Sequence, residues 1–264
     1  MMPYQLNWQE ICQMIPKRKA DAQKGDFGRL LCITGSRNMP GACLLSTQAA
    51  LRGGAGLVTV ATAPENPMRL AAAAPEAMWL PLETDEAGFL RSSDQNRKTL
   101  EKQLSRANAV LLGCGLGVTE ETRRLVHWVL EQAVCPVVLD ADGLNCAVSC
   151  IELSRRTGKD WILTPHPGEM ARLTGRSIPQ IQENRVETAT QFAAAYPVTL
   201  ALKGAGTLVA QGSRLAQNPT GNPGMSRGGS GDVLAGLIAA FAAQGIPSWE
   251  TACAGVYLHG LAGD

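Results

Sequence analysis

A glycine-rich segment that ends in an acid is the most distinctive chemical feature of this sequence. Four glycines lie between Gly224 and Gly231, and Asp232 follows them directly before the apolar stretch 233–243. Glycines let the backbone approach a ligand closely, and the start of a helix offers unpaired N–H groups and the positive end of the helix dipole. The segment therefore predicts either a site for a phosphate or another oxyanion, or a flexible loop with Asp232 as an ordinary helix-start acid.

The acid separates this segment from the phosphate-binding loops of P-loop proteins. The sequence contains no G-x-x-x-x-G-K-[ST] motif, and Asp232 stands where that motif has its cation. A carboxylate repels a bound phosphate, but it can accept a proton from a hydroxyl group that attacks a phosphoryl group. With adjacent N–H groups stabilising the transferred charge, Asp232 is predicted to be the general base of a small-molecule phosphoryl transfer.

Three side chains with oxygen ligands follow the apolar run 136–139. They belong to Asp140, Asp142 and Asn145. Hard cations such as Mg²⁺ choose oxygen ligands and keep several water molecules, so these residues predict a site that binds Mg²⁺ directly or through water. The same residues also suit a turn in which Asp142 or Asn145 caps a helix. The sequence leaves both interpretations open.

A histidine held between two prolines follows the apolar run 161–164. Pro165 and Pro167 restrict the backbone around His166 and keep it out of a helix interior. We therefore expect the imidazole, which titrates near neutral pH, to face a ligand. Glu169, three residues later, also suits the first turn of a helix.

The elements that position these residues are apolar runs alternating with longer helical patterns. This alternation is typical of parallel strands joined by crossover helices, whose ligands bind beyond the carboxyl ends of the strands. The runs predict strands at 30–34, 57–61, 109–112, 136–139, 161–164 and 198–202. The helical patterns include 41–52, 120–132, 180–195 and 232–243. A hairpin is expected from 203–206 into 207–210, with a second turn at 211–213.

Composition excludes several other classes of protein. The chain has 264 residues, 45% of them hydrophobic, which is typical of a folded α/β domain rather than a disordered tail. Its 24 basic and 23 acidic residues give a net charge of +1, so no global field attracts nucleic acid or an anionic membrane. No apolar run approaches the roughly 20 residues of a membrane span, and residues 1–8 carry no secretory signal. We therefore expect a cytoplasmic protein.

The chain shows no linker rich in Pro, Gly or Ser, so we expect one domain over residues 1–264. Residues 255–264 have the pattern of a buried helix but end in an acid without a stop signal, which predicts a truncated C-terminus. Eight cysteines without a C-x-x-C pair suit reduced thiols in the core. Cys146 and Cys150, four residues apart, are too few ligands for a zinc site on their own.

Taken in order, these motifs resemble those of the ADP/ATP-dependent NAD(P)H-hydrate dehydratases, relatives of the ribokinase-like kinases. The matching segments span nearly the whole chain: 24–29, 35–42, 52–59, 113–117, 140–145, 164–169, 203–207 and 218–232. The resemblance implies a ribokinase-like three-layer α/β/α fold with a mostly parallel central sheet. It also implies an enzyme that restores (S)-NADHX and (S)-NADPHX, which are hydrated at C6 of the nicotinamide ring, by nucleotide-driven loss of water.

The resemblance further implies a role for each matching residue. ADP phosphorylates the ring hydroxyl, which then leaves as phosphate, and AMP is the other product. Asp232 is the base, and the anion is bound by the amides of Gly229, Ser230 and Gly231. The residues implied to contact the hydrated dinucleotide are Ala42, Gly115, His166 and Asp232. Those implied to hold the adenine nucleotide are Lys203, Gly204, Ala205, Gly206, Thr207 and Gly231.

The metal, the donor and the assembly also follow from the resemblance. It implies Mg²⁺ at the site, with Asp140 and Glu169 as the metal candidates. Related sugar kinases carry Asn-x-x-Glu near such a site, whereas this chain has His166-Pro-Gly-Glu169, which favours the dehydratases. Ser226-Arg227 departs from the Ala-Thr that the family more often has, which affects the shape of the loop. Bacterial-type members favour ADP, and a homo-oligomer is implied, with a tetramer suggested. The alternative function is a ribokinase-like kinase of a small hydroxylated metabolite or vitamin precursor.

Overall fold

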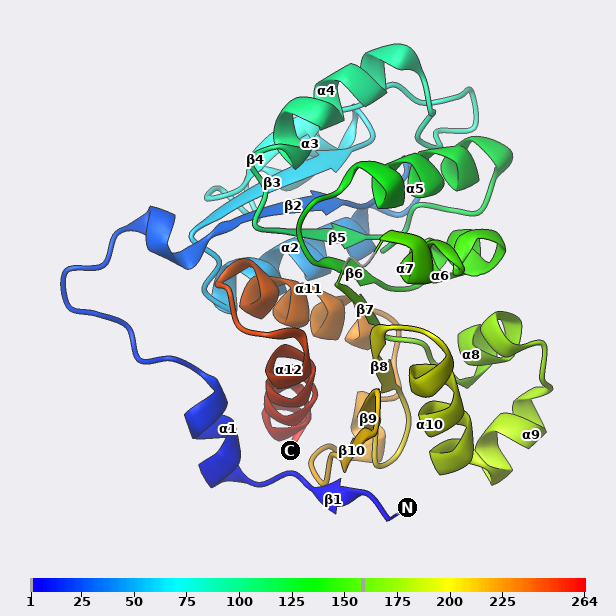
Figure 1. Cartoon of the computed structure of the whole chain (residues 1–264). Coiled ribbons are helices and arrows are strands. Elements are labelled where there is room, and N and C mark those ends of the chain that lie inside the picture. The colour runs from blue at the N-terminus through cyan, green and yellow to red at the C-terminus, as the bar shows by residue number, and fades with distance from the viewer. Residues whose placement is uncertain (1, 158–159) are drawn as a thin grey trace.

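The apolar runs of the sequence form the strands of one mostly parallel sheet (Figure 1). The computed structural model describes residues 2–157 and 160–264. Its strands are β1 (Tyr4–Gln5), β2 (Arg29–Ile33), β3 (Leu57–Thr62), β4 (Met78–Pro81), β5 (Ala109–Leu112), β6 (Val137–Leu139), β7 (Trp161–Leu163), β8 (Val198–Leu202), β9 (Leu208–Gln211) and β10 (Arg214–Gln217). Their order is β1-β10-β9-β8-β7-β6-β5-β2-β3-β4. Among these strands only β9 runs against its neighbours, β8 and β10.

Helices cover both faces of this sheet. They are α1 (Trp8–Met14), α2 (Pro40–Arg52), α3 (Asn66–Leu70), α4 (Asp94–Leu104), α5 (Glu120–Gln132), α6 (Asp142–Ala147), α7 (Leu153–Thr157), α8 (Pro167–Thr174), α9 (Ile178–Glu183), α10 (Arg185–Ala195), α11 (Ser230–Ala243) and α12 (Ser248–Gly263). Successive side chains of a strand point to opposite faces, so in β2 Leu31 and Ile33 enter one hydrophobic core while Leu30 and Cys32 enter the other. The first core lies beneath α4 to α10, and the second beneath α1, α2, α3, α11 and α12.

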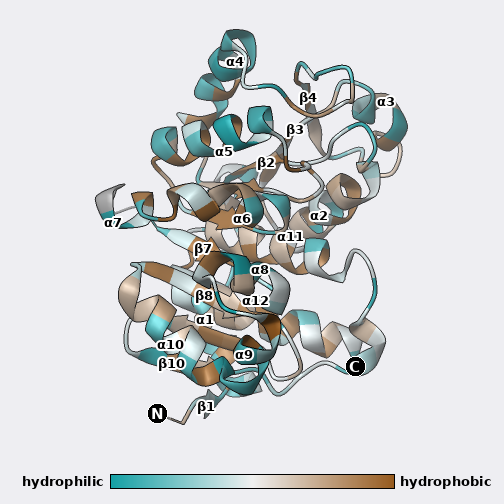
Figure 2. Cartoon of the chain, turned by 90° about the vertical axis from the view of Figure 1, so that its right-hand side faces the viewer, coloured by the Kyte–Doolittle hydropathy of each residue, from teal (hydrophilic) through white to brown (hydrophobic). Residues whose placement is uncertain are grey.

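Helix α11 occupies the interior of its layer. It packs against α2, α12 and the central strands β5 and β6, and Leu234, Ile238 and Phe241 are all buried. A helix enclosed in this way is apolar on nearly all sides, whereas the outer helices α4 and α5 are largely hydrophilic (Figure 2). The packing fixes the position of the first turn of α11, which holds Asp232.

Most of the predicted elements are confirmed, including the three-layer fold, the six strands and the hairpin formed by β8 and β9. The prediction of one helix over 180–195 is wrong. The structure has two helices, because Asn184 between them has a non-helical backbone with φ −128° and ψ 43°. The helix predicted from Asp232 begins at Ser230, which places Asp232 inside its first turn. The short edge strands β1 and β4 were not predicted.

All eight cysteines are free thiols, and six of them are buried. The expectation of a core position is wrong for Cys12, which is exposed because it lies on the surface helix α1.

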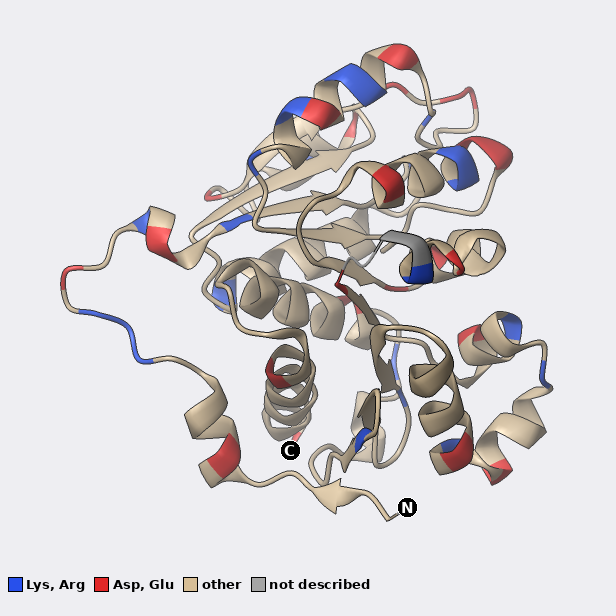
Figure 3. Ribbon diagram, in the orientation of Figure 1, with Lys and Arg blue, Asp and Glu red and all other residues tan. Residues whose placement is uncertain are grey.

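Charged residues of both signs are spread over the outer helices in the view of Figure 3, in keeping with the balanced composition. Within the described residues, no helix combines the length and the apolar character that a bilayer crossing needs.

Candidate functional site

The site forms where the carboxyl ends of β6, β7 and β8 meet the first turn of α11. Asp140 follows β6, Thr164 follows β7 and Lys203 follows β8. The Lys203 ammonium donates to Asp140 Oδ1 over 2.6 Å, and the Thr164 hydroxyl donates to the same oxygen over 2.8 Å. Asp140 is only 1% exposed, so its charge is neutralised by a buried partner and not by water.

Glu169 extends this buried pair toward α8. Its Oε2 lies 3.8 Å from Lys203 Nζ and accepts a hydrogen bond from the backbone N–H of His166 over 2.8 Å. Burial raises the pKa of Glu169 to about 7, with Lys203 lowering it and the charge of Asp140 raising it further. The Glu169 carboxyl therefore changes charge near neutral pH, next to the Lys203–Asp140 ion pair.

The first turn of α11 faces this cluster. Gly229 caps the helix with φ +90°, a left-handed conformation that glycine adopts without strain. Gly231 approaches Lys203 so closely that a Cβ there would lie 3.3 Å from Nζ. The backbone N–H groups of a first helical turn have no intrahelical acceptor, so they and the helix dipole give this position a positive potential.

Asp232 lies in the same turn, beside a second carboxylate and a thiol. Ligand atoms of Asp232, Asp140 and Cys114 all lie within 4.8 Å of one another. Burial raises the pKa of Asp232, and the charge of Asp140 raises it further. A raised pKa makes the carboxylate a stronger base, which is the property that proton abstraction from a hydroxyl requires. Burial also raises the pKa of the Cys114 thiol well above its ordinary value, so this group stays neutral.

The expected dinucleotide contacts Ala42 and Gly115 lie where the strand order reverses, between β2 and β5. The loops after these two strands are joined by hydrogen bonds from Gly35 N to Cys114 O (2.8 Å) and from Ser36 N to Gly115 O (2.7 Å). Ala42 and Gly115 face each other, because a Cβ on Gly115 would come within 2.9 Å of the Ala42 methyl group. Such reversal points are where open parallel sheets bind ligands.

His166 is the N-cap of α8 and not a free loop residue. Its Nδ1 accepts a hydrogen bond from Gly168 N over 2.9 Å, and this leaves Nε2 as the protonated nitrogen of the neutral ring. The side chain is 51% exposed, and Nε2 lies 3.4 Å from Glu169 Oε1. Burial, followed by the charges of Lys203 and Arg172, lowers the pKa of His166. The imidazole is thus a neutral donor on the rim of the site.

The expected nucleotide loop, residues 203–207, is the turn of the β8–β9 hairpin. Lys203 N donates to Pro165 O over 2.8 Å, which ties the loop to the segment that carries His166. Thr207 Oγ1 donates to Gly204 O over 3.0 Å and closes the turn. The loop therefore sits at the same edge of the sheet as Asp140 and the start of α11.

Two other residues singled out from the sequence, Asp142 and Asn145, bond to neighbouring loops and helices. Asp142 accepts a hydrogen bond from Gly117 N over 2.8 Å, and Asn145 Oδ1 accepts one from Arg172 over 2.9 Å. Cys146 and Cys150 belong to none of the metal-capable groups found among the described residues.

Two features of the site escaped sequence analysis. Cys114 reads as one apolar residue in a glycine-rich turn, and nothing in its spacing indicates the neighbouring carboxylates. Ala141 has φ 50° and is the one non-glycine residue with positive φ in the described chain. This strained backbone lies between Asp140 and Asp142, and such strain often marks a functional turn. An alanine offers no sequence signal for it.

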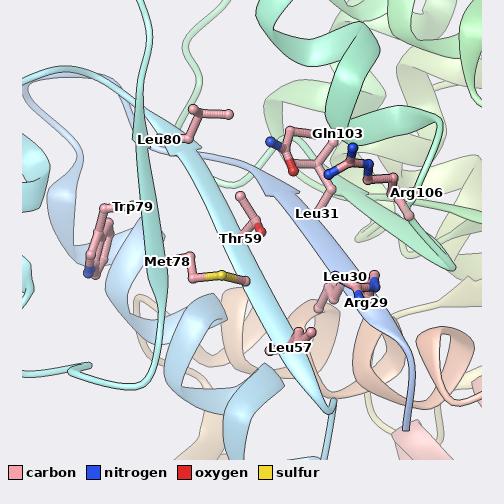
Figure 4. A pocket seen from close by; sticks show the side chains of 11 residues that line it. Arg29, Leu30, Leu31, Leu57, Thr59, Met78, Trp79, Leu80, Gln103 and Arg106 are labelled. Carbon is pink, nitrogen blue, oxygen red and sulfur yellow. The ribbon is translucent and has the colours of Figure 1, made fainter. Parts of the chain in front are cut away.

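A cavity of about 310 Å³ lies elsewhere (Figure 4). Arg29, Leu57 and Met78 line it at the amino ends of β2, β3 and β4, together with Gln103 and Arg106 near the end of α4. None of the candidate site residues lines this cavity. It therefore belongs to the opposite edge of the sheet.

Comparison with known proteins adds independent information. A profile of the NAD(P)H-hydrate dehydratase family matches residues 30–264. The chain is 42% identical over 251 residues to the bifunctional NAD(P)H-hydrate repair enzyme of Moorella thermoacetica, covering 95% of this chain and 47% of that protein. It is 38% identical over 252 residues to the ADP-dependent (S)-NAD(P)H-hydrate dehydratase of Neisseria meningitidis serogroup B, covering 94% of this chain and 80% of that one.

The fold has close counterparts as well. The ADP/ATP-dependent NAD(P)H-hydrate dehydratase of Bacillus subtilis, co-crystallised with ATP and Mg²⁺, superposes with a TM-score of 0.82 at 31% identity, covering 99% of this chain and 88% of that one. The chain spans about half the length of the bifunctional relatives that it matches.

Proposed function

Because the chain belongs to the NAD(P)H-hydrate dehydratase family, we propose that it converts (S)-NADHX and (S)-NADPHX to NADH and NADPH with ADP as the phosphoryl donor. One observation carries the proposal most directly. A half-buried carboxylate, Asp232, lies in the first turn of α11 beside the Lys203–Asp140 pair. A base and an anion-binding helix start occur together there, as transfer of a phosphoryl group to a hydroxyl requires.

The proposed reaction has two steps. Asp232 accepts the proton of the ring hydroxyl at C6 while that oxygen attacks the β-phosphorus of ADP, and AMP leaves. The C6–O bond then breaks, phosphate departs and the ring double bond forms with loss of a proton. The first step converts a poor leaving group into a good one, and the sum is NADHX plus ADP giving NADH, AMP and phosphate.

The roles of the other residues follow from their positions. The amides of Gly229, Ser230 and Gly231 stabilise the charge on the transferred phosphoryl group. Ala42 and Gly115 contact the dinucleotide at the reversal point of the sheet, and His166 donates to it from Nε2. The adenine nucleotide occupies the hairpin loop formed by Lys203, Gly204, Ala205, Gly206 and Thr207, with Gly231 at its phosphates.

Mg²⁺ would enter with the nucleotide and reduce the negative charge on the transferred phosphoryl group. One oxygen of Asp140 is occupied by Lys203 and Thr164, and both oxygens of Glu169 lie against His166. The other oxygen of Asp140, which lies 3.9 Å from Cys114 Sγ in a group of side chains that could hold a metal ion, would remain open to the ion, and Glu169 would contact it through the ion's water ligands. Mg²⁺ commonly keeps several waters and binds substrate phosphates with few protein ligands.

The proposal extends to the chain as a whole. We treat residues 1–264 as one domain with this activity, acting in the cytoplasm as a homo-oligomer, with a tetramer as the first assembly to test. Analytical ultracentrifugation of the purified protein measures the assembly state directly.

The experiment that tests the function incubates purified protein with NADHX, Mg²⁺ and either ADP or ATP. Recovery of the NADH absorbance that depends on a nucleotide supports the proposal, and the nucleotide with the higher kcat/KM is the donor. Recovery without nucleotide, or none with either, contradicts it. In the latter case the alternative, a kinase of a small hydroxylated metabolite or vitamin precursor, predicts a stable phosphorylated product from a panel of such acceptors.

A further inference from the structure

A half-buried arginine, Arg185, binds the backbone of the proposed nucleotide loop through its guanidinium group. Arg185, the first residue of α10, donates from its Nη2 to the carbonyl oxygens of Leu202 (3.1 Å) and Gly206 (3.4 Å), at either end of the loop. Its guanidinium also lies where a Cβ of Gly204 would be, which explains why that position has no side chain. The loop is therefore built around the guanidinium group.

The positive charge of Arg185 is not neutralised by an acid. Among the described ion pairs none includes Arg185, and Glu187 in the same helical turn bonds to Gln191 instead. Burial lowers the pKa of Arg185, and no acidic neighbour offsets that effect. The start of α10 adds the positive end of a helix dipole, which makes the position still less favourable for a cation.

The other cation at the loop is in the opposite situation. Lys203 is paired with Asp140 over 2.6 Å and lies near Glu169, so most of its charge is already balanced. The positive groups that remain for a phosphate at the loop are therefore Arg185, which no acid pairs among the described residues, and the first turn of α11. A half-buried cation without an acidic partner is stabilised when an anion binds close to it.

The geometry of the peptide groups shows how Arg185 orients the loop. A trans peptide is planar, with its C=O and N–H on opposite sides. The carbonyl of Leu202 faces Arg185, and the N–H of the same peptide, that of Lys203, donates to Pro165 O over 2.8 Å. Arg185 and the His166 segment thus hold this peptide from its two sides, which fixes where residues 203–207 begin.

We propose that Arg185 is a positioning residue for the nucleotide loop and the counter-charge for the phosphates of the bound nucleotide. The inference rests on the proposed function for the identity of the ligand as an adenine nucleotide. It predicts that Arg185 contributes to binding of the phosphates and not of the adenosine part. This role differs from that of Lys203, because the charge of Lys203 is paired with Asp140.

The test measures dissociation constants by calorimetry for ADP with Mg²⁺, AMP and adenosine, in wild-type protein, Arg185→Gln and Arg185→Lys. Arg185→Gln is expected to raise the dissociation constants of ADP and AMP by at least about tenfold, since a charge-assisted contact is lost. The dissociation constant of adenosine is expected to change by less than about threefold. Arg185→Lys keeps the positive charge but loses the several N–H donors of the planar guanidinium group. Its affinity for ADP is therefore expected to lie between those of wild type and Arg185→Gln.

Arg176→Gln is the matched control, because Arg176 also bonds to α10, through Thr188 and Gln191, and makes no contact with the loop. It is expected to leave all three affinities unchanged. Equal losses for adenosine and ADP in Arg185→Gln, or no loss of ADP affinity, would overturn the inference. Circular dichroism checks folding, and Arg185→Lys provides the comparison if the Gln variant is unfolded. If wild-type protein binds ADP but never regenerates NADH, the dehydratase proposal fails while the variants still decide the role of Arg185.

Discussion

At the scale of single residues, the proposed site contains three acidic groups with different surroundings. Asp140 is bound to Lys203 and Thr164, Glu169 is buried with a pKa of about 7, and Asp232 lies in the first turn of a helix with a raised pKa. Groups with environments that differ in this way can take different roles in one reaction. Asp232 combines a raised pKa with a position in the first turn of α11, whose apolar body is buried, and we propose it as the base.

Replacement of Asp232 by Asn is the first prediction at this scale. We expect kcat for NADH recovery to fall by about 10³-fold, because general-base catalysis contributes on this order, while ADP affinity changes little. Asp142→Asn is the control, since an asparagine oxygen can still accept the hydrogen bond from Gly117 N. Its kcat is expected to stay within a few fold of wild type. Wild-type turnover in Asp232→Asn would remove this residue as the base.

Glu169 gives a prediction on stability and pH. Its pKa rises in the folded protein from 4.5 to about 7, so between these values the folded state binds more protons than the unfolded state. The free energy of unfolding therefore falls as the pH rises through this window. Glu169→Gln removes this loss and keeps the acceptor for His166 N. Urea unfolding measures the free energy of unfolding of both proteins at pH 5 and pH 8. Between these two values the difference between variant and wild type should shift in favour of the variant by up to about 3 kcal/mol. A difference that is the same at both pH values would contradict the raised pKa.

Sequence reasoning at this scale found the residue types but not their partners. It singled out Asp140, His166, Lys203 and Asp232, because charged residues beyond predicted strand ends are visible in the sequence. It proposed Asp140 as a metal candidate, and it gave no sign of the ion pair that the structure shows with a lysine 63 residues away. Pairings between distant segments depend on tertiary packing, and no local pattern encodes them.

At the scale of elements, the hairpin loop between β8 and β9 is sensitive to a single added atom at Gly204. Gly204 has φ +148°, and a Cβ there would collide with the guanidinium of Arg185. Gly204→Ala is therefore expected to raise KM for ADP by about tenfold or more and to destabilise the fold by about 1–3 kcal/mol.

Gly212→Ala is the matched control for this loop. Gly212 lies in the next turn with φ +55°, and nothing lies within 4 Å of the added Cβ. Its KM for ADP should match that of wild type, with only a small loss of thermal stability from the left-handed backbone. Steady-state kinetics gives the KM for ADP of both variants, and thermal unfolding gives their stability. Equal KM values in the two variants would show that the loop tolerates the added atom.

The helices show where periodic patterns are informative and where they fail. The ranges 41–52 and 120–132 were predicted almost to the residue, since each is one amphipathic or apolar helix with a clear end. The range 180–195 was not, because helical residues lie on both sides of Asn184 and only its backbone angles separate α9 from α10. The separation matters, since it makes Arg185 the first residue of a helix.

At the scale of the whole molecule, one topological feature brings the site together. The strand order reverses between β2 and β5, and the loops after these strands meet beside the first turn of α11. The alternation of strands and helices along the chain was sufficient to predict a parallel sheet with a site at its carboxyl edge. The edge strands β1 and β4 were missed, because they are short and their pairing depends on neighbours already in place.

In the proposed reaction the nucleotide is consumed in order to remove water from the hydrated dinucleotide. The most direct measurement follows NADH by absorbance and AMP and phosphate by chromatography, in one reaction of purified protein with NADHX, ADP and Mg²⁺. We expect one AMP and one phosphate for each NADH formed, with the rates of formation of all three lowered by about 10³-fold in Asp232→Asn. Release of AMP and phosphate without NADH, or a stable phosphorylated dinucleotide in place of NADH, would contradict it.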